Sequence, residues 1–545
     1  MIRTPPIPWA APAENRAVKR TPLSLGIILL AVLAIRAPLL GIPFDRDEGG
    51  YAYIAWRMGF HELPYRDWID QKPPGIFWIY RLALDLPLDP IRAIHWMALL
   101  FCAASACALF FVARRFTTTF WAIMAAILFA LLSADPLVEG TSANTELFML
   151  LPVILSQLAL FKAIERNQSV AISALLGGIA TGTAIAFKQV AIVNLPLLAG
   201  AYWLFVEGPG RLRKVFTFTA WMAVGAAAPW LLIGGWFTSQ HELAAMIYHV
   251  FTHNVGYVET LSWKERLESC AAALNAIYRS EALPWVFAAG GLASLGIARR
   301  FRPLLYLAGW GAASVAGICM SGYFFRHYFV QWLPPLCVAA AHGAGAAESA
   351  GLWGSSPAWR RRAILALLFL LLPAIILAPF LLVLSPRQAA REIYPGNSLF
   401  AEMPALGKRI AECTSADQTV FLFAADPEVL FYAGRLSATR YIFLLPLYGS
   451  YADADSLQRK TADEVAASRP AAALYLPNEM FFSDGNDQYF TRWSKAYLKQ
   501  GFHIDTYLAI DAYNIAHLVP ASSSEVPELS KAGRFCGALF VRNSR

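Results

Sequence analysis

The chain has 545 residues, of which 57% are hydrophobic and 15% are charged, and its formal net charge is +8. Soluble domains carry about 25% charged residues, so this composition excludes an ordinary soluble protein and indicates one that crosses a membrane many times. Nucleic-acid binding and membrane topology could both explain the positive charge. The sequence has no nucleic-acid-binding motif, so topology is favoured. The length leaves room for a bundle of spans and one further domain.

Apolar runs close to the roughly 20 residues needed to cross a bilayer recur from the start of the chain. They lie at 24–40, 94–113, 119–134, 146–164, 169–187, 189–206, 215–237, 283–299, 302–321, 327–347 and 363–385. We therefore expect about eleven transmembrane helices. We expect the first to remain as a span, because the basic stretch before it is long and no small-residue cleavage pattern follows it.

Lys and Arg are expected to cluster in short cytoplasmic loops. The basic clusters lie at 16–20, 114–115, 162–166, 211–214, 299–302 and 360–362. All of them fall on one side of an eleven-span arrangement. We therefore expect a cytoplasmic segment (1–23), a transmembrane domain (24–385) and an outer domain (386–545), with outer loops at 41–93, 135–145, 238–282 and 322–326.

The first outer loop carries an unusual density of carboxylates directly after the first apolar run. Asp45 and Glu48 have the spacing of a helix N-cap. The apolar positions that follow, from Tyr51 to Met58, repeat on one face, as they would in a helix lying at the membrane interface. A capped amphipathic helix explains Asp45 and Glu48, but it leaves Asp47 as one more carboxylate than the cap requires. Asp47 is therefore the first candidate for a chemical role.

A polar turn follows, in which Tyr65 and Asp70 precede Lys72 and two prolines. The next stretch, GIFWIYRLAL at 75–84, is too short to span a bilayer, so we expect it to lie in the interface. Lys72 has two interpretations. It could extend toward lipid headgroups, or it could offer a point charge to a phosphate.

Further polar residues open or interrupt spans on the outer side. Glu146 begins the fourth span, after a loop that carries Asp135 and Glu139. Lys188 interrupts an apolar stretch at its outer turn, and Arg326, His327 and Tyr328 begin the tenth span. Outer cations run against the topology rule, so they are better candidates for anion ligands than the inner ones.

The long outer loop contains His249, His253, Asn254 and Tyr257. A solvated or packed helix explains these residues as well as a binding site does. The cysteines of the chain do not have zinc-type spacing. We therefore predict no metal site and no cofactor, and dependence on a divalent cation stays open.

After residue 385, apolar runs alternate with polar breaks. We expect short strands at 419–425, 439–445, 471–477 and 535–542, and helices at 453–468 and 487–500, which together make a small α/β domain. A nucleotide-binding glycine fingerprint is lacking. Cys413 and Cys536 could form a disulfide outside the cytoplasm, or they could remain two thiols.

The motifs of the first outer loop resemble those of membrane glycosyltransferases with the GT-C fold. The resemblance rests on Asp47-Glu48, Tyr51-Ala52, Pro64 to Asp67 and Lys72-Pro73-Pro74. The branch that looks most similar is the protein O-mannosyltransferase-like family 39, with the bacterial transferases of aminoarabinose and galacturonic acid to lipid A. The similarity covers about residues 20–345. It implies an all-α membrane bundle of the GT-C type with interfacial helices in the first outer loop, followed by a periplasmic α/β domain.

The resemblance also implies a sugar donor linked to polyprenyl phosphate such as undecaprenyl phosphate, used on the periplasmic face of a bacterial inner membrane. The acceptor would be lipid A, a polysaccharide or a protein. Asp47, with Glu48 beside it, would be the catalytic carboxylate, and Lys72 would meet the donor phosphate. Gly50 and Gln71 depart from the aminoarabinose transferases, which carry arginine and glutamate there. Aminoarabinose is therefore in doubt as the sugar.

Because this chain lacks that arginine, other outer cations would have to bind the donor phosphate in its place. We predict that Lys188, Arg326 and His327 bind the donor phosphate together with Lys72. We predict contacts with the substrates for Tyr51, Tyr65, Asp70, Glu146 and Tyr328.

The chemistry agrees with an inverting transfer, which needs one base for the acceptor hydroxyl and cations for the phosphate leaving group. Two alternatives belong to other classes. A lipid or sugar transporter or flippase would favour internal repeats and charged or broken helices at mid-membrane, and the sequence shows neither a clear repeat nor central acidic residues. A non-catalytic envelope scaffold would have no use for the outer polar cluster.

Overall fold

The computed structural model describes residues 17–165, 169–255, 261–351, 357–394, 398–448, 453–476, 489–511 and 515–543. Predictions that involve Arg16, Arg166, Tyr257, Pro477 and the start of the helix expected at 487–500 lie outside these residues. The chain forms two compact units. Unit 1 comprises Met1–Leu40, His95–Trp236 and Trp263–Val383, and unit 2 comprises Gly41–Ile94, Phe237–Ser262 and Leu384–Arg545.

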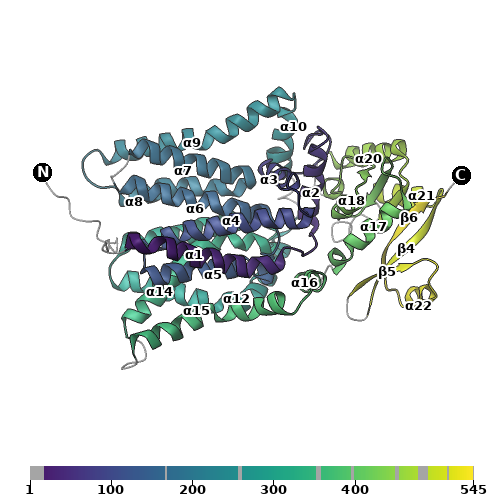
Figure 1. Ribbon diagram of the computed structural model, residues 1–545. Coiled ribbons are helices and arrows are strands. Elements are labelled where there is room, and N and C mark those ends of the chain that lie inside the picture. The colour runs from purple at the N-terminus through teal and green to yellow at the C-terminus, as the bar shows by residue number, and fades with distance from the viewer. Residues whose placement is uncertain are drawn as a thin grey trace. The chain divides into compact units, whose positions relative to one another are not determined.

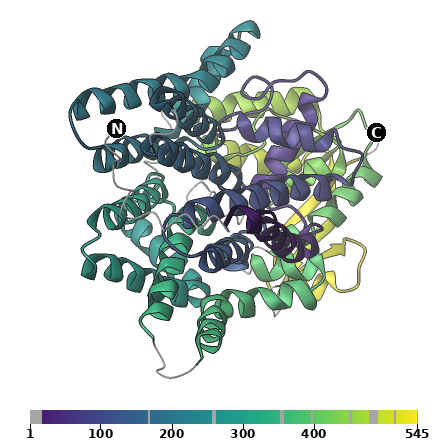
Figure 2. The ribbon, with the colours of Figure 1, turned by 60° about the vertical axis from the view of Figure 1, so that its left-hand side comes forward.

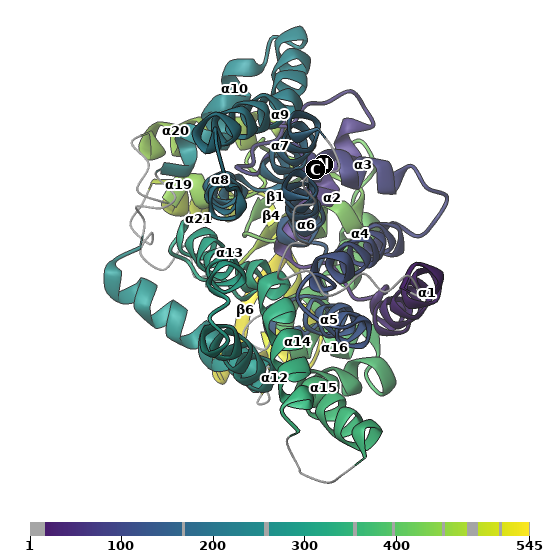
Figure 3. The same cartoon turned by 90° about the vertical axis from the view of Figure 1, so that its left-hand side faces the viewer.

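Unit 1 consists of helices that run roughly alongside one another (Figures 1 and 3). Its α-helices are α1 (Ala17–Arg36), α4 (Pro90–Ala113), α5 (Thr119–Leu132), α6 (Thr145–Ile164), α7 (Val170–Phe187), α8 (Asn194–Phe205), α9 (Arg211–Ser239), α12 (Trp263–Ile297), α13 (Phe301–Cys319), α14 (Leu333–Ser349) and α15 (Ala358–Leu382). Short 3₁₀ turns join several of them: η1 (Ala37–Leu39), η2 (Pro136–Val138), η3 (Gln189–Val193) and η5 (Arg326–Trp332).

Six helical segments among the described residues are long and apolar enough to cross a membrane. They are Thr21–Leu39, Pro90–Ala113, Thr145–Ile164, Val170–Phe187, Arg211–Ser239 and Ala358–Leu382. The chain is therefore a multi-pass membrane protein. A helix is present in each of the predicted spans, but several are shorter or more polar than a simple span, so the figure of about eleven stays a prediction.

Three predicted spans differ in form from the sequence expectation. The run at 327–347 is divided into η5 and α14 at Leu333. The run at 189–206 is divided into η3 and α8 by a change from a 3₁₀ to an α geometry at Asn194. The run at 283–299 lies within α12, a 35-residue helix that also takes in part of the expected outer loop. A helix of that length measures about 50 Å, which exceeds the thickness of a bilayer's hydrocarbon core.

Glycines allow the backbones of two helix pairs in unit 1 to approach closely. A Cβ atom at Gly178 or Gly182 of α7 would collide with the carbonyl oxygens of Met222 or Ala226 in α9. A similar approach joins α12 and α14, where a Cβ on Gly343 would collide with the Phe287 carbonyl. Small residues at such crossings are the usual means of packing helices in a bilayer, where apolar side chains gain little by leaving lipid.

A buried hydrogen-bond network also connects helices of unit 1. The Gln157 amide donates to Asn194 Oδ1 at 2.7 Å, and Tyr306 donates its hydroxyl hydrogen to Gln157 Oε1 at 3.0 Å. Asn194 in turn donates to Ser156 Oγ at 2.7 Å. The network ties α6, α8 and α13 together, and it satisfies polar groups that would be costly if left unpaired in an apolar core.

Unit 2 contains the helices of the first outer loop, part of the long outer loop, and the C-terminal region. Its helices are α2 (Arg46–Met58), α3 (Gly75–Leu84), α10 (Leu243–Ile247), the π-helical turn η4 (Tyr248–Thr252), α16 (Pro386–Ile393), η6 (Ser398–Ala401), α17 (Met403–Cys413), α18 (Glu428–Ala433), α19 (Leu445–Tyr448), α20 (Ala454–Ser468), α21 (Tyr489–Leu498) and α22 (Val526–Lys531). The short apolar stretch at 75–84 therefore forms a separate helix of 10 residues, as expected.

Six strands form one mixed sheet in the order β2-β1-β3-β6-β4-β5. They are β1 (Thr419–Phe423), β2 (Leu436–Ser437), β3 (Ala472–Tyr475), β4 (Phe502–Ile510), β5 (Ala516–Pro520) and β6 (Phe535–Arg542). β1 pairs in parallel with β2 and β3, whereas β6 is antiparallel to both β3 and β4. The C-terminal strands are yellow in Figure 2, and the helices that accompany the sheet are green. The α/β composition of this region agrees with the sequence expectation.

The prediction of a strand at 439–445 is wrong. Tyr441, Ile442 and Leu444 are buried there, but the chain forms an irregular segment that leads into α19. A short apolar run cannot distinguish a strand from a buried connection, which is the physical reason for the error. β4 and β5 were missed because polar residues interrupt their apolar pattern.

Cys413 and Cys536 are not joined by a disulfide. The Cys413 thiol lies 3.9 Å from Asp505 Oδ1, and the Cys536 thiol lies 3.4 Å from the Leu508 carbonyl oxygen. Of the two alternatives that the sequence left open, the structure has the two thiols.

The close approach of α7 and α9 leads to a prediction about stability. We expect Gly182→Ala to destabilise the protein by about 1–3 kcal/mol, because the added methyl group forces two backbones apart. Gly235→Ala in α9 is the matched control, since no atom lies within 4 Å of its added Cβ. The thermal unfolding midpoint of the purified protein in detergent would measure the effect. Equal midpoints for the two variants would contradict the packing.

Candidate functional site

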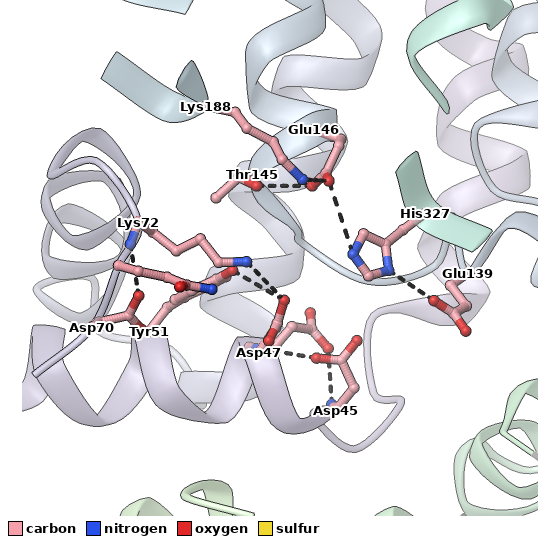
Figure 4. Close-up of polar contacts among 12 residues, drawn as sticks. Asp45, Asp47, Tyr51, Asp70, Lys72, Glu139, Thr145, Glu146, Lys188 and His327 are labelled. Carbon is pink, nitrogen blue, oxygen red and sulfur yellow. Dashed lines mark hydrogen bonds and ion pairs between the residues drawn. The ribbon is translucent and has the colours of Figure 1, made fainter. Parts of the chain in front are cut away.

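The first-loop cluster is defined here as Asp45, Asp47, Glu48, Tyr51, Asp70 and Lys72, and all six residues belong to unit 2 (Figure 4). The first turn of α2 fixes three of the carboxylates. The Asp45 side chain accepts the Glu48 amide hydrogen at 2.9 Å, and Glu48 accepts the Asp45 amide hydrogen at 3.2 Å. This reciprocal capping box confirms the interpretation of Asp45 and Glu48. It leaves the carboxylate of Asp47 outside the cap.

Asp47 binds Lys72 across the polar turn. Lys72 Nζ lies 3.2 Å from Asp47 Oδ2, and Tyr51 donates its hydroxyl hydrogen to the same oxygen at 3.3 Å. The Asp47 side chain is 28% exposed and that of Lys72 14%, whereas Tyr51 is fully buried. The ion pair is therefore held on a buried aromatic wall, with part of its surface open to a ligand.

The backbone around Lys72 is held by two further members of the turn. The Lys72 amide donates to Asp70 Oδ1 at 2.8 Å, and the Lys72 carbonyl accepts the Tyr65 hydroxyl hydrogen at 2.6 Å. Tyr65 has a positive φ of 72°, a strained conformation for a bulky residue. Such strain persists where the surrounding structure fixes it, and here two side chains fix the position of Lys72.

Burial raises the proton affinity of two carboxyl groups in the first-loop cluster. Asp70 is 7% exposed, and burial together with the charge of Asp47 raises its pKa to about 6, although Lys72 opposes the shift. Burial, with Glu48 and Asp47 nearby, also raises the pKa of Asp45 well above its ordinary value. Protonation of Asp45 and Asp70 therefore lowers the electrostatic repulsion among the carboxyl groups of the first-loop cluster.

Close packing explains why α2 has glycine at two positions beside the acidic residues. A Cβ at Gly49 would collide with Glu428 of α18, and one at Gly50 would lie 2.5 Å from the Phe443 ring. A long side chain at position 50 would therefore require the Phe443 ring to move. This is a physical reason for the departure that the sequence showed at Gly50.

The bundle cluster is defined here as Glu139, Glu146, Lys188, Arg326, His327 and Tyr328, all in unit 1. Figure 4 labels Glu139, Glu146, Lys188 and His327. Lys188 ends α7 and forms a buried ion pair with Glu146, which is 1% exposed. The Lys188 ammonium also lies 3.7 Å from the centre of the Tyr328 ring, and Thr145 donates to the other oxygen of Glu146 at 2.8 Å. The predicted cation is therefore paired with a carboxylate and an aromatic face.

Glu139 joins the two other cations of the bundle cluster. Arg326 Nε donates to Glu139 Oε1 at 3.1 Å, and His327 Nδ1 lies 2.8 Å from Glu139 Oε2. His327 Nε2 faces Glu146 at 3.8 Å. Burial alone would raise the pKa of Glu139, but the hydrogen bond from His327 and the charge of Arg326 hold it below its usual value. Glu139 is therefore the anionic centre of this group.

Most members of the two clusters were expected from the sequence. Apart from the helix cap, the contacts that each member makes within its own cluster were not. Glu139 was noted as part of its loop and was not predicted as a partner of Arg326. Tyr394, which donates to Asp45 at 2.8 Å, and Asp426, which lies 3.3 Å from Arg46, were missed entirely. These partners are more than 340 residues away in sequence, and no local pattern marks them.

A metal centre is not evident among the described residues, since no group of three or more His, Cys, Asp and Glu side chains is placed to hold an ion. The acidic residues of the first-loop cluster are instead committed to a cap, to Lys72 and to the Lys72 backbone. The arrangement can hold a proton acceptor beside an ammonium group at a partly open surface.

The raised pKa of Asp70 predicts a pH dependence of stability. Asp70 is protonated in the folded protein up to about pH 6 but in the unfolded chain only up to its ordinary value of 3.8. Folding therefore takes up a proton between these pH values, and the free energy of unfolding falls by up to about 3 kcal/mol as the pH rises through them.

Asp70→Asn keeps the acceptor for Lys72 and removes this titration. We expect the thermal unfolding midpoint of the variant to rise relative to that of the parent between pH 4.5 and pH 7. Thermal unfolding in detergent at several pH values would measure it. A difference that stays constant with pH would contradict the assignment.

Comparison with known proteins gives a family match for part of the chain. Residues 71–233 match the family described as dolichyl-phosphate-mannose-protein mannosyltransferase. A search of curated protein sequences finds no match.

Solved structures match over nearly the whole chain. ArnT from Cupriavidus metallidurans bound to undecaprenyl phosphate is 17% identical, with a TM-score of 0.54, over 94% of this chain and 99% of that chain. The oligosaccharyltransferase AglB from the archaeon Archaeoglobus fulgidus, in complex with an inhibitory peptide and a dolichol phosphate, is 9% identical, with a TM-score of 0.53, over 93% of this chain and 75% of that chain.

The arabinofuranosyltransferase AftD from Mycobacteria is 13% identical, with a TM-score of 0.51, over 97% of this chain and 40% of that chain. These proteins are glycosyltransferases with the GT-C fold. The chain thus has the fold of the GT-C membrane glycosyltransferases, similar to ArnT, as the resemblance implied; the number of spans and the periplasmic location of the C-terminal domain stay predictions.

Proposed function

We propose that this protein is an inverting glycosyltransferase that moves a sugar from a polyprenyl-phosphate donor to an acceptor of the cell envelope. The reaction takes place on the periplasmic face of a bacterial inner membrane. The N-terminus lies in the cytoplasm, and the region after residue 385 lies in the periplasm. The distribution of Lys and Arg along the sequence supports this orientation.

The observation that carries the proposal is the ion pair between Asp47 and Lys72. Its two side chains come from different segments of the first outer loop and meet at 3.2 Å, and both remain partly exposed. The capping box fixes one partner, and Asp70 and Tyr65 fix the backbone of the other. A carboxylate and an ammonium group held in this way are the parts that a transfer with a phosphate leaving group needs.

The reaction has one displacement step. Asp47 accepts the proton of an acceptor hydroxyl group, and the acceptor oxygen attacks the anomeric carbon of the donor sugar. The bond between that carbon and the phosphate oxygen breaks, and the electron pair leaves with polyprenyl phosphate. A single displacement inverts the configuration at the anomeric carbon.

Lys72 has two partners during this step. Its ammonium group holds Asp47 before the donor binds, and it moves toward the donor phosphate when that charge arrives. The carboxylate of Asp47 is then available for the acceptor hydroxyl group. The negative charge of the leaving phosphate is neutralised by the same ammonium group.

Glu48 does not share the base role in this proposal. Its carboxylate accepts the Asp45 amide hydrogen, and the residue is 2% exposed. Asp70 and Tyr65 act through the Lys72 backbone, and Tyr51 acts through Asp47. The catalytic role is therefore assigned to Asp47 alone.

The bundle cluster is kept as a second anion-binding group. Lys188, Arg326 and His327 are predicted phosphate ligands, and each faces Glu146 or Glu139 in the structure. A phosphate would have to compete with these carboxylates for the cations. Glu146 and Tyr328 would contact substrate only through that exchange.

Structural relatives support the donor class. ArnT was solved with undecaprenyl phosphate, and AglB was solved with a dolichol phosphate. A polyprenyl phosphate is thus a ligand of two proteins with this fold. The sugar and the acceptor, whether lipid A, a polysaccharide or a protein, are left to experiment.

Asp47→Asn should abolish sugar transfer, because the amide has a similar shape but cannot take the proton. Loss of a general base typically lowers the rate by about 10²–10⁴-fold. The rate would be measured with the purified protein, a panel of polyprenyl-phosphate sugars and candidate envelope acceptors.

The matched control for this variant is Asp85→Asn, which changes an exposed carboxylate of the same loop that pairs with Arg81. It should keep most of the activity. Full transfer by the Asp47 variant would remove the base from the proposal.

Lys72→Gln should weaken the use of the donor. Loss of a charge-assisted hydrogen bond to the phosphate costs about 1.5–3 kcal/mol, which corresponds to a rise of about 10- to 150-fold in the KM for the donor. Lys408→Gln, on the exposed side of α17, is the matched control. An unchanged KM for the donor would show that Lys72 does not meet the phosphate.

A further inference from the structure

A pocket of about 430 Å³ lined by charged and aromatic residues lies within unit 2. Its walls come from the first outer loop, from α10 and η4, and from α20 with the segment before α19. The volume falls within the roughly 300–1,000 Å³ that is typical of small-molecule sites, near the lower end. It suits one or two sugar rings better than a lipid chain or a peptide.

The charges that line this pocket have both signs. Arg66 and Arg440 reach it together with Lys460, and Glu242 and Asp453 face them. Each arginine is also paired with a carboxylate outside the lining, Arg66 with Asp67 and Arg440 with Glu464. The pocket therefore offers hydrogen-bond donors and acceptors without a strong excess of positive charge, which does not favour a phosphate or another anion.

Aromatic and imidazole side chains form the rest of the surface. Tyr65, Tyr248 and Tyr441 line the pocket, and the His249 ring stacks on Tyr65 with ring centres 6.4 Å apart. His249 Nδ1 is buried and has no hydrogen-bond partner among the described residues. This atom is also closed to solvent, so a ligand in the pocket does not reach it, and His249 contributes only its ring to the wall.

The protonation state of His249 agrees with an uncharged ligand. Burial, together with the neighbouring His253, lowers the pKa of His249 to about 4. The imidazole is therefore neutral at physiological pH and adds no positive charge to the pocket. A protonated imidazole would instead favour an anion.

Tyr65 and Lys72 connect the pocket to Asp47, the proposed base. Tyr65 lines the pocket with its ring, and its hydroxyl group donates to the Lys72 carbonyl. Asn254, which follows η4, donates to the neighbouring Gln71 carbonyl at 3.1 Å. The wall of the pocket and the segment that carries Lys72 are thus one hydrogen-bonded structure.

We propose that this pocket binds an uncharged saccharide portion of the acceptor, one or two rings long, with its hydroxyl groups on the charged side chains and its apolar face on tyrosine. This role rests on the proposed transferase function. The acceptor is accordingly a glycan or a glycolipid that already carries a neutral sugar. It is recognised at a distance from the hydroxyl group that reacts.

The direct test is binding without turnover. Saturation-transfer difference NMR would be recorded on the full-length protein in lipid nanodiscs with methyl α-glucoside, methyl α-mannoside and methyl α-galactoside, and with glucose 6-phosphate as the anionic comparison. We expect a signal from at least one methyl glycoside.

Two substitutions assign that signal to the pocket. Ala244→Trp fills the pocket from an exposed position of α10 and should remove the signal, whereas Ala532→Trp, exposed at the end of α22, should leave it unchanged. Absence of any glycoside signal, a signal from glucose 6-phosphate alone, or a signal that survives Ala244→Trp would overturn the proposal.

A kinetic readout separates this proposal from the transferase function. In an active preparation, Ala244→Trp should raise the KM for the acceptor and leave the KM for the donor unchanged; an unchanged acceptor KM would overturn the role of the pocket. A protein that binds glycosides in the pocket but transfers no sugar from any donor would contradict the proposed function and leave the saccharide site standing.

Discussion

The N-terminal cap of α2 is the constraint on which the proposed chemistry depends. Asp45 and Glu48 satisfy each other's amide groups and so fix the first turn of the helix. Asp47 lies between them, so the helix geometry places its backbone, and Lys72 and Tyr51 contact its carboxylate. The partial positive charge of the helix N-terminus favours a negative charge on Asp47. Lys72, in the polar turn that follows α2, forms an ion pair with it. A single capping box thereby places three carboxylates and leaves one of them for chemistry.

Close packing around α2 holds this arrangement within unit 2. A Cβ at Gly49 would collide with the backbone of Glu428 in α18, and a Cβ at Gly50 would collide with the Phe443 ring. A larger side chain at position 50 would require that ring to move. The positive charge that pairs with Asp47 comes from Lys72, which a separate segment supplies.

Much of the fold was predictable because membrane helices appear in the sequence as long apolar runs, and because the capping box is a local motif. The separate helix at 75–84 followed from its length, and Asp47 stood out because the cap does not need it. The remaining features depend on contacts that no local pattern encodes. The pairing of Glu139 with Arg326 joins residues 187 positions apart, and the buried segment at 439–445 is as apolar as a strand without being one.

The most direct measurement of the central claim is the anomeric configuration of the product. A donor of known configuration would be incubated with the purified protein and an acceptor, and the new glycosidic bond would be analysed by NMR. One carboxylate acting as a base on the acceptor predicts inversion at the anomeric carbon. Retention of configuration would require a covalent or otherwise two-step route, with a second carboxylate about 5 Å from the first, and would contradict the assignment of Asp47 as the base.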